Sequence, residues 1–401
     1  MDKASGRRRL SKGPERRSAL SVNGRVSLWR KRLYLEGQGS RSPLDVLVDA
    51  AEATVSVGVR DLCCRLNGNG KSFDRAAENL EKAGQVKMSG EKLREVVEAE
   101  GKRALALAKS GELGPDWMAK DCKVVNPQGR EVSRVYLGAD GFMAPLVTDV
   151  EKRKRRKKVK EKRQKRGRKA RPLATAKKGA DGPWKEFKAV VFYDQSMEHR
   201  LVSVTKGKCQ EAGKLMQRDA GRLGFSAADE RVGNIDGGPW IMGQIEVRRM
   251  PMTATGLDFF HLSQNVHQSR RVIFGEENEA GKQRAGELLH TVKHEGYQPF
   301  WEELLELRKQ SRGQARRKEA DRLLHYVAER KEMILYPEFL AKGWQIGSGP
   351  TESQCRVLPD RVKGAGMRWD GDNAEAVMAL EALRQSNQWD GYRRMALYQR
   401  N

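Results

Sequence analysis

The stretch VYLGADGFM, which runs from Val135 to Met143, decides the fold that we predict for this chain. It has the composition of a buried β-strand, and the Asp140-Gly141 pair within it predicts the end of that strand. A helix is predicted over Cys209–Leu223, and further strand-like runs lie at Phe187–Tyr193, Leu201–Val204, Val232–Asp236 and Leu257–Phe260. Strands that alternate with helix in this order predict an α/β domain with a mixed sheet.

Segments of helical period lie before and after these strands. Within residues 44–130, Ser72 can cap a helix that ends near Gly84, and Ser89 can start the next one. Two such helices are typical of a DNA-binding helix-turn-helix, and equally of any small all-α bundle. Residues 266–340 predict an all-α insertion between core segments 131–265 and 341–401, with apolar positions at Leu288, Leu304, Leu305, Leu323, Leu324 and Val327.

Residues 1–43 are polar and basic and lack a convincing apolar period. We expect a mostly disordered arm there that touches phosphates. No apolar run approaches the roughly 18 residues that span a bilayer. No apolar segment follows the Arg-rich start, as one would in a secretory signal. The sequence therefore predicts a cytoplasmic protein associated with the nucleoid.

The charge balance favours a polyanionic partner. The chain has 78 Lys+Arg against 53 Asp+Glu and a net charge of +25, and neutralising phosphates releases condensed counterions. Nucleic acid is the leading class of partner, and an anionic membrane surface is second. The run Lys152–Arg171 alone holds 15 Lys/Arg and one acid in 20 positions. It lies in an expected loop, residues 150–183, which is either a solvated surface or, as we favour, a phosphate-binding segment.

Three acidic residues stand out by their context: Asp140, Asp236 in VGNIDGGPWI, and Glu352 in GSGPTESQCR. The two Asp residues each follow an apolar β-run and precede a glycine, which lets a metal or a substrate backbone approach closely. Glu352 opens a predicted helix after a Gly-Ser-Gly-Pro turn. One Asp-Gly alone is most often a plain turn. Three carboxylates in these contexts suit two hard divalent ions, with Mg²⁺ expected and Mn²⁺ as a substitute.

Five segments in this order, YLGADGF, WKEFKAVVFYD, IDGGPWI, LDFFHLSQNV and GSGPTESQCRVLPDRVKGAGMRW, resemble bacterial insertion-sequence transposases with an RNase H-like DDE core, closest to the Kra-type group. The resemblance covers residues 44 to 390. It implies a first acid on the first core strand, a second just after the fourth, and a third on a late helix. In this chain those acids are Asp140, Asp236 and Glu352, as catalytic metal ligands.

The resemblance also implies supporting residues. Asp258 and His261 in LDFFH match a D-x-x-H element that supports the active site, although a helix-capping Asp beside a packed His is an equal alternative. Arg356 lies one helical turn after Glu352 and is either a phosphate contact or part of a surface Glu-Arg pair. The other candidate DNA-binding cations are Arg155, Arg156, Lys157, Lys158, Lys363 and Arg368.

The chain departs from this family in two places. Many relatives carry a cysteine-based zinc ribbon before a Pro-Leu-Asp element, here Pro43-Leu44-Asp45, but the preceding LYLEGQGSRS has no cysteine. The five cysteines form no CxxC pair, so we expect buried free thiols and no stoichiometric zinc. Pro359 falls within the helix that should continue from Glu352, and it predicts a kink or a stop there.

These features predict strand cleavage at the ends of an insertion sequence, followed by attack of the freed 3′-hydroxyl on target DNA. The expected partners are terminal-repeat and target DNA, with a homo-oligomer assembled on them. Two alternatives are a nuclease of the same fold that cuts without joining, and a non-catalytic DNA-binding protein derived from a transposase. The presence of all three acids argues against the second alternative.

Overall fold

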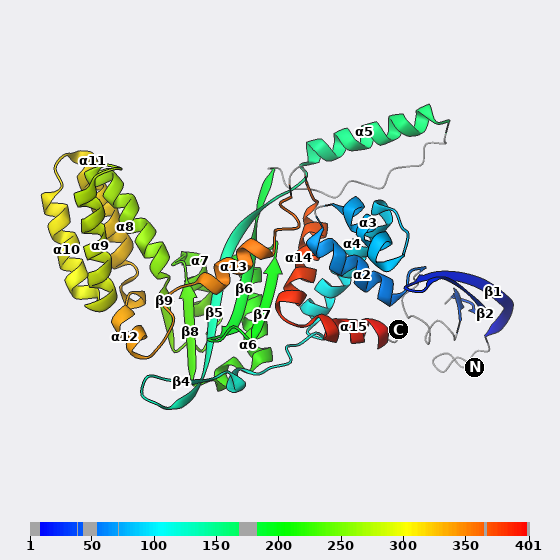
Figure 1. Cartoon of the computed structure of the whole chain (residues 1–401), viewed down its shortest axis with the longest axis horizontal. Helices are drawn as coiled ribbons and strands as arrows, with labels where there is room; N and C mark the ends of the chain where they lie inside the picture. Colours follow the sequence, from blue (N-terminus) through cyan, green and yellow to red (C-terminus); the bar gives the residue numbers. More distant parts are fainter. Residues whose placement is uncertain are drawn as a thin grey trace. The chain divides into compact units, whose positions relative to one another are not determined.

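A computed structural model describes residues 9–37, 39–42, 54–70, 72–167, 183–364 and 367–398 (Figure 1). The predicted Pro43-Leu44-Asp45 element and residues 168–182 of the basic segment lie outside this description. The chain forms two compact units. Unit 1 consists of Met1–Gly114, Ala144–Lys185 and Leu358–Asn401, and unit 2 consists of Pro115–Met143 and Glu186–Val357.

Unit 2 is built on a mixed sheet, as predicted. The strands along it follow the order β7-β6-β5-β8-β9, and the short strand β4 pairs with β5. β6 and β7 are antiparallel, whereas β5–β8 and β8–β9 are parallel pairs. The strands are β4 (Lys123–Val125), β5 (Glu131–Pro145), β6 (Trp184–Asp194), β7 (Arg200–Thr205), β8 (Glu230–Ile235) and β9 (Ala254–Leu257).

The central strands are buried along continuous runs rather than at alternate positions. Every residue from Phe187 to Asp194 in β6 is buried, and so is every residue from Ser133 to Ala139 in β5. Such runs are expected where both faces of a sheet are covered. Helices α6 (Cys209–Leu223) and α7 (Pro239–Val247) lie beside the sheet in Figure 1. The predicted bounds of α6 are correct.

Two strand ends differ from the prediction. β5 does not end at Asp140-Gly141 but continues to Pro145, so Asp140 lies within a strand. β9 ends at Leu257 rather than Phe260. There the side chain of Asp258 accepts hydrogen bonds from the amides of Phe260 and His261 and starts a helix, because an Asp cap satisfies free amide groups of a first helical turn.

The predicted all-α segment after the sheet is confirmed. It consists of α8 (Phe259–Phe274), α9 (Glu279–His294), α10 (Tyr297–Gln310), α11 (Gln314–Ala328) and α12 (Tyr336–Ala341). Most of its predicted core positions are buried, but Leu305 is exposed, because α10 turns Leu304 and Leu307 inward instead. Helix α13 (Gly349–Val357) follows and stops before Pro359, as that proline predicts.

Unit 1 contains a helical bundle. Its helices are α2 (Val57–Asn69), α3 (Phe73–Gly84), α4 (Gly90–Ser110), α14 (Gly371–Gln385) and α15 (Trp389–Tyr398). Ser72 and Ser89 cap α3 and α4 as predicted. α14 packs along α4, where a Cβ at Gly101 would lie 2.5 Å from the carbonyl oxygen of Ala376. This packing places the final helices with the N-terminal ones rather than with the sheet.

The expectation of a disordered N-terminal arm is wrong for the described residues. They form an antiparallel sheet of β1 (Leu10–Ser21), β2 (Gly24–Leu35) and β3 (Gly39–Arg41). The signal that was overlooked is Asn23-Gly24, a hairpin dipeptide. Ser21 pairs with Gly24 across the turn, and Gly24 has a φ of 94°, which favours glycine.

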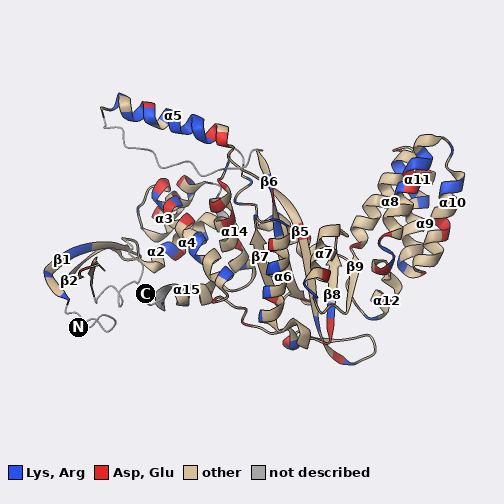
Figure 2. Cartoon of the chain, turned by 180° about the vertical axis from the view of Figure 1, so that it is seen from behind, with Lys and Arg blue, Asp and Glu red and all other residues tan. Residues whose placement is uncertain are grey.

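The basic segment also differs from the predicted loop, because residues Asp149–Lys165 form helix α5. Lys and Arg are good helix formers. Thr148 and Glu151 make a capping box, and the acids Asp149 and Glu151 lie in the first turn, where the helix dipole favours them. No residue of α5 is buried. The helix therefore presents its Lys and Arg side chains to solvent, and Figure 2 marks Lys and Arg along most of its length.

Among the described residues, no helix is long and apolar enough to cross a membrane.

Candidate active site

Strand register places three aspartates together in unit 2. β5 and β8 pair with Leu137 opposite Gly233, and Asp140 and Asp236 each come three residues later. β8 and β9 pair with Ile235 opposite Leu257, and Asp236 and Asp258 follow directly. Because parallel strands advance together, Asp140 within β5 and Asp236 and Asp258 just after β8 and β9 lie at one level of the sheet.

Asp140 is half-buried, and its backbone neighbour Gly141 donates a 2.6 Å hydrogen bond to Oδ1. Burial raises the pKa of Asp140; the Gly141 hydrogen bond opposes this, and the nearby charge of Asp236 raises it further. The thiol of Cys355 on α13 also acts on this carboxylate as a hydrogen-bond partner. Sequence reasoning missed Cys355, because only the fold brings α13 against β5.

Asp236 comes immediately after β8 and is also half-buried. The amide of Gly238 donates a 2.7 Å hydrogen bond to its Oδ1. Gly237 has a φ of 76°, a backbone conformation that glycine adopts without strain. Gly237 therefore allows the turn that holds the carboxylate in place.

Asp258 is buried, with 1% exposure, and it fixes the start of α13. Its Oδ2 accepts a 2.8 Å hydrogen bond from the amide of Ser348 and a second from the Ser348 hydroxyl. Although burial alone raises it, these bonds and the neighbouring His261 lower the pKa of Asp258 to about 2. Asp258 thus caps α8, which is one of the two alternatives that the sequence left open, and its carboxylate lies 3.7 Å from His261 Nδ1.

Glu352 lies in the first turn of α13 and joins the cluster through His261. The Nδ1 atom of His261 is 3.7 Å from Glu352 Oε1 and 3.7 Å from Asp258 Oδ2. Both separations exceed hydrogen-bonding distance, and the buried Nδ1 atom has no hydrogen-bond partner. The carboxylates of Asp258, Asp236 and Glu352 together raise the pKa of His261, Asp258 most strongly.

Gly138 explains how α13 approaches the sheet. A Cβ at this position would clash with the side chain of Thr351, which is 1% exposed and precedes Glu352. Glycine within a strand often marks such a close approach. This glycine stands in the quoted LGADG segment, so the signal was present, but the partner helix could not be known from it.

The donor set fits hard divalent cations. Asp140, Asp236, Asp258 and Glu352 supply carboxylate oxygens, which Mg²⁺ and Mn²⁺ prefer. Asp258, His261 and Glu352 also offer ligand atoms within 4.8 Å of one another. Asp236 is close enough for its charge to raise the pKa of Asp140, and the unpaired Nδ1 of His261 lies between two carboxylates. Both observations describe a concentration of negative charge that a cation would neutralise.

Among protein-family models and curated proteins, no match to the chain is found.

The predicted DNA-binding cations fall into several groups. In unit 1, Arg155, Arg156 and Arg368 line one pocket of about 760 Å³, together with Phe73 and Trp369. Arg368 also forms a 3.0 Å ion pair with Glu151 at the start of α5. Lys157 and Lys158 are exposed on α5, Lys363 is exposed in unit 1, and Arg356 is exposed on α13 in unit 2. Each of these side chains except Arg156, which is half-buried, is open to a large ligand.

Proposed function

We propose that this chain is a metal-dependent DDE transposase, which cuts DNA at the ends of an insertion sequence and joins the freed ends to target DNA. One observation carries the proposal: Asp140 and Asp236 lie level on neighbouring parallel strands, and His261 is within 3.7 Å of Glu352 from a third element. Such a group of carboxylates in a chain of net charge +25 suits phosphodiester chemistry.

The arrangement of the sheet supports an RNase H-like core. Counting from β5, the first acid lies on the first strand, the second directly after the fourth, β8, and the third on the later helix α13. This is the placement that the resemblance implies. The antiparallel β6–β7 pair beside the parallel pairs of β5, β8 and β9 agrees with a mixed sheet of that kind.

In this proposal Asp140, Asp236 and Glu352 would hold the divalent ions. Bound Mg²⁺, or Mn²⁺ in its place, supplies activation of the attacking hydroxyl and stabilisation of the leaving oxygen. Asp258 acts as a positioning residue, because its hydrogen bonds with Ser348 fix the turn from which Glu352 projects. His261 adds a positive charge or a further nitrogen donor beside the carboxylates.

The rest of the proposed function is DNA binding. The exposed cations of α5 would contact phosphates, which carry affinity without sequence information. The helices α3 and α4 are candidates for contacts with terminal repeats. The protein would act as a homo-oligomer assembled on terminal-repeat and target DNA, near the bacterial nucleoid.

The test is an assay of Mg²⁺-dependent cleavage on the terminal repeats that flank the coding sequence, followed by joining of pre-cleaved ends to a target plasmid. Cleavage and joining that both require Mg²⁺ are expected. Cleavage without joining would identify a nuclease. Binding to the repeats without either reaction would identify a DNA-binding protein that does not catalyse.

A further inference from the structure

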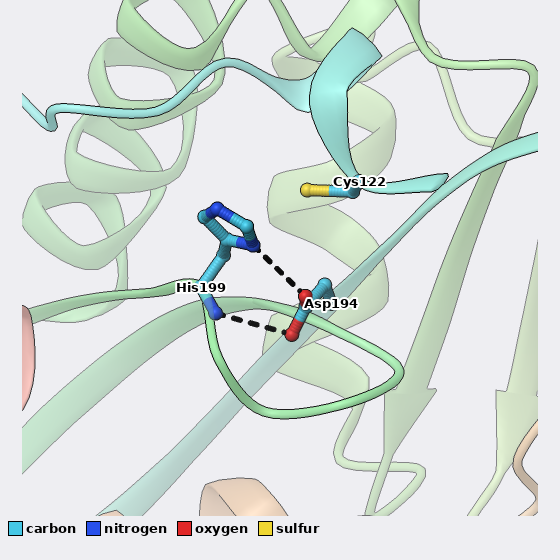
Figure 3. Close-up of side chains that lie close together, drawn as sticks. All are labelled: Cys122, Asp194 and His199. Atoms are coloured by element: carbon cyan, nitrogen blue, oxygen red, sulfur yellow. Dashed lines mark hydrogen bonds and ion pairs between the residues drawn. The ribbon is translucent and has the colours of Figure 1, made fainter. Parts of the chain in front are cut away.

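A second cluster of metal-binding side chains lies in unit 2, on elements other than those that carry the acidic triad. Cys122, Asp194 and His199 each offer one ligand atom, and these atoms lie within 4.8 Å of one another. Figure 3 shows the cysteine sulfur, the imidazole and the Asp194 carboxylate turned toward a common point. Cys122 lies between the 3-10 helix η1 (Ala119–Asp121) and β4. Asp194 ends β6, and His199 immediately precedes β7.

We propose that Cys122, Asp194 and His199 form a zinc site, with water in the fourth position. A thiolate, an imidazole nitrogen and a carboxylate oxygen are the three ligand types that Zn²⁺ accepts, usually in tetrahedral geometry. In such a site the ligand atoms are about 3.5 Å apart. Because the side chain of His199 is 34% exposed, solvent can reach the cluster.

Each ligand is held by its surroundings. The carbonyl oxygen of Cys122 accepts a 2.8 Å hydrogen bond from the amide of Arg134, which fixes this segment to β5. The ring of His199 packs against Trp117, with ring centroids 5.3 Å apart. Asp194 accepts a 2.7 Å hydrogen bond from the Ser196 hydroxyl. A site whose ligands are already positioned needs little reorganisation when an ion binds.

The simpler explanation of this cluster is a hydrogen-bonded turn. Asp194 Oδ1 accepts a 3.2 Å hydrogen bond from the amide of His199, and Oδ2 lies 2.9 Å from His199 Nδ1. The turn accounts for Asp194 and His199. It does not include the thiol of Cys122, which a separate segment brings to the same place and which donates a 3.8 Å hydrogen bond to the Met118 carbonyl oxygen. In the zinc site, coordination replaces the Nδ1–Oδ2 hydrogen bond, and the thiol proton leaves to solvent.

The consequence for the fold is a cross-link between two segments. The ion would tie η1 and β4, which lead into β5, to the turn that joins β6 and β7. Cys122 sits beside Arg134, near the beginning of β5, whereas Asp140 lies in its second half. The zinc site is therefore separate from the acidic triad, and it does not depend on the proposed transposase function.

The experiment measures metal content in the full-length protein, purified without chelators, together with the variants Cys122→Ser and His199→Gln. We expect about one zinc per chain in the native protein and loss of that zinc in both variants. The controls are Cys209→Ser and His290→Gln, which change a cysteine and a histidine outside the cluster. A third control, Glu352→Gln, tests whether the metal resides in the acidic cluster instead. All three controls are expected to keep their zinc.

A second measurement replaces zinc with Co²⁺ in metal-stripped native protein. A thiolate ligand gives Co²⁺ a charge-transfer absorption band, which oxygen and imidazole ligands do not. The Asp258, His261 and Glu352 group lacks sulfur, and Cys355→Ser removes the thiol beside Asp140. A band that persists in Cys355→Ser and Cys209→Ser therefore points to Cys122 even if Cys122→Ser does not fold. His199→Gln changes a partly exposed ring, and circular dichroism checks its fold. Native protein without zinc and without the band, or variants that keep both, would overturn the proposal.

Discussion

Asp140 and Asp236 stand side by side, because each follows the β5–β8 pair of Leu137 and Gly233 by three residues. The distance along the chain between them is irrelevant to this relationship, which the parallel register alone sets. It also explains why the pKa of Asp140 responds to the charge of Asp236.

The first prediction concerns the acidic triad. Asp140→Asn, Asp236→Asn and Glu352→Gln should each reduce Mg²⁺-dependent cleavage by on the order of 10³-fold or more, because each removes a metal ligand. Affinity for DNA should hold or rise as negative charge is lost. The double variants should be no worse than the single ones, since the three act as a unit. Asp321→Asn, a substitution on helix α11, is the matched control. If a single triad variant cleaves DNA as fast as this control, the residue that it replaces is not a catalytic metal ligand.

The second prediction concerns α5. Replacing six of its Lys and Arg residues with Gln should flatten the plot of log affinity against log salt by about 0.9 for each contact made to duplex DNA. The loss should be similar on terminal-repeat and random DNA, because phosphate contacts carry no sequence information. Binding is measured on both across a salt series, with circular dichroism as the check on folding. An unchanged slope would mean that α5 is only a solvated helix.

The third prediction concerns the contact between β5 and α13. Gly138→Ala should lower the free energy of unfolding by about 1–3 kcal/mol, since the added methyl group meets the buried side chain of Thr351. Cleavage should fall as well, because Glu352 follows Thr351 on the displaced helix. Thr351→Ala in the same chain should restore part of both losses. Denaturant unfolding and the cleavage assay are applied to both single variants and to the double variant. If the two substitutions change stability and cleavage additively, Gly138 and Thr351 are not in contact.

The fourth prediction concerns a buried ion pair that holds unit 1 together. Arg60 Nε lies 2.9 Å from Glu100 Oε1, with both side chains 6% exposed, and the Tyr392 hydroxyl donates a 2.6 Å hydrogen bond to Glu100. Glu100→Gln should destabilise the protein by about 3–5 kcal/mol, because it leaves a buried guanidinium without its counter-charge.

Glu91→Gln is the control for this measurement, because it breaks an exposed ion pair with Arg94 on the same helix α4. It should change the free energy of unfolding by less than about 1 kcal/mol. Equal effects of the two substitutions in denaturant titrations would show that burial of the Arg60–Glu100 pair does not matter.

Local signals were sufficient for much of the secondary structure. The α6 helix and the serine caps of α3 and α4 follow from apolar period and from side chains that accept nearby amide hydrogen bonds. The same kind of reasoning failed in the two basic segments, where the high charge led us to predict an unfolded chain. The N-terminal hairpin and α5 were interpreted as unfolded, although Asn23-Gly24 and the capping box at Thr148 were both present in the sequence.

The sequence by itself determined which residues could carry the chemistry, because the types and contexts of Asp140, Asp236 and Glu352 are local properties. Only the tertiary structure decided which residues from distant segments lie next to one another. Strand register aligned Asp258 with Asp236, and packing set Thr351 against Gly138 and brought Cys122 close to His199. The physical reason is that register and packing depend on contacts between residues far apart in the chain, and no spacing along one segment records them.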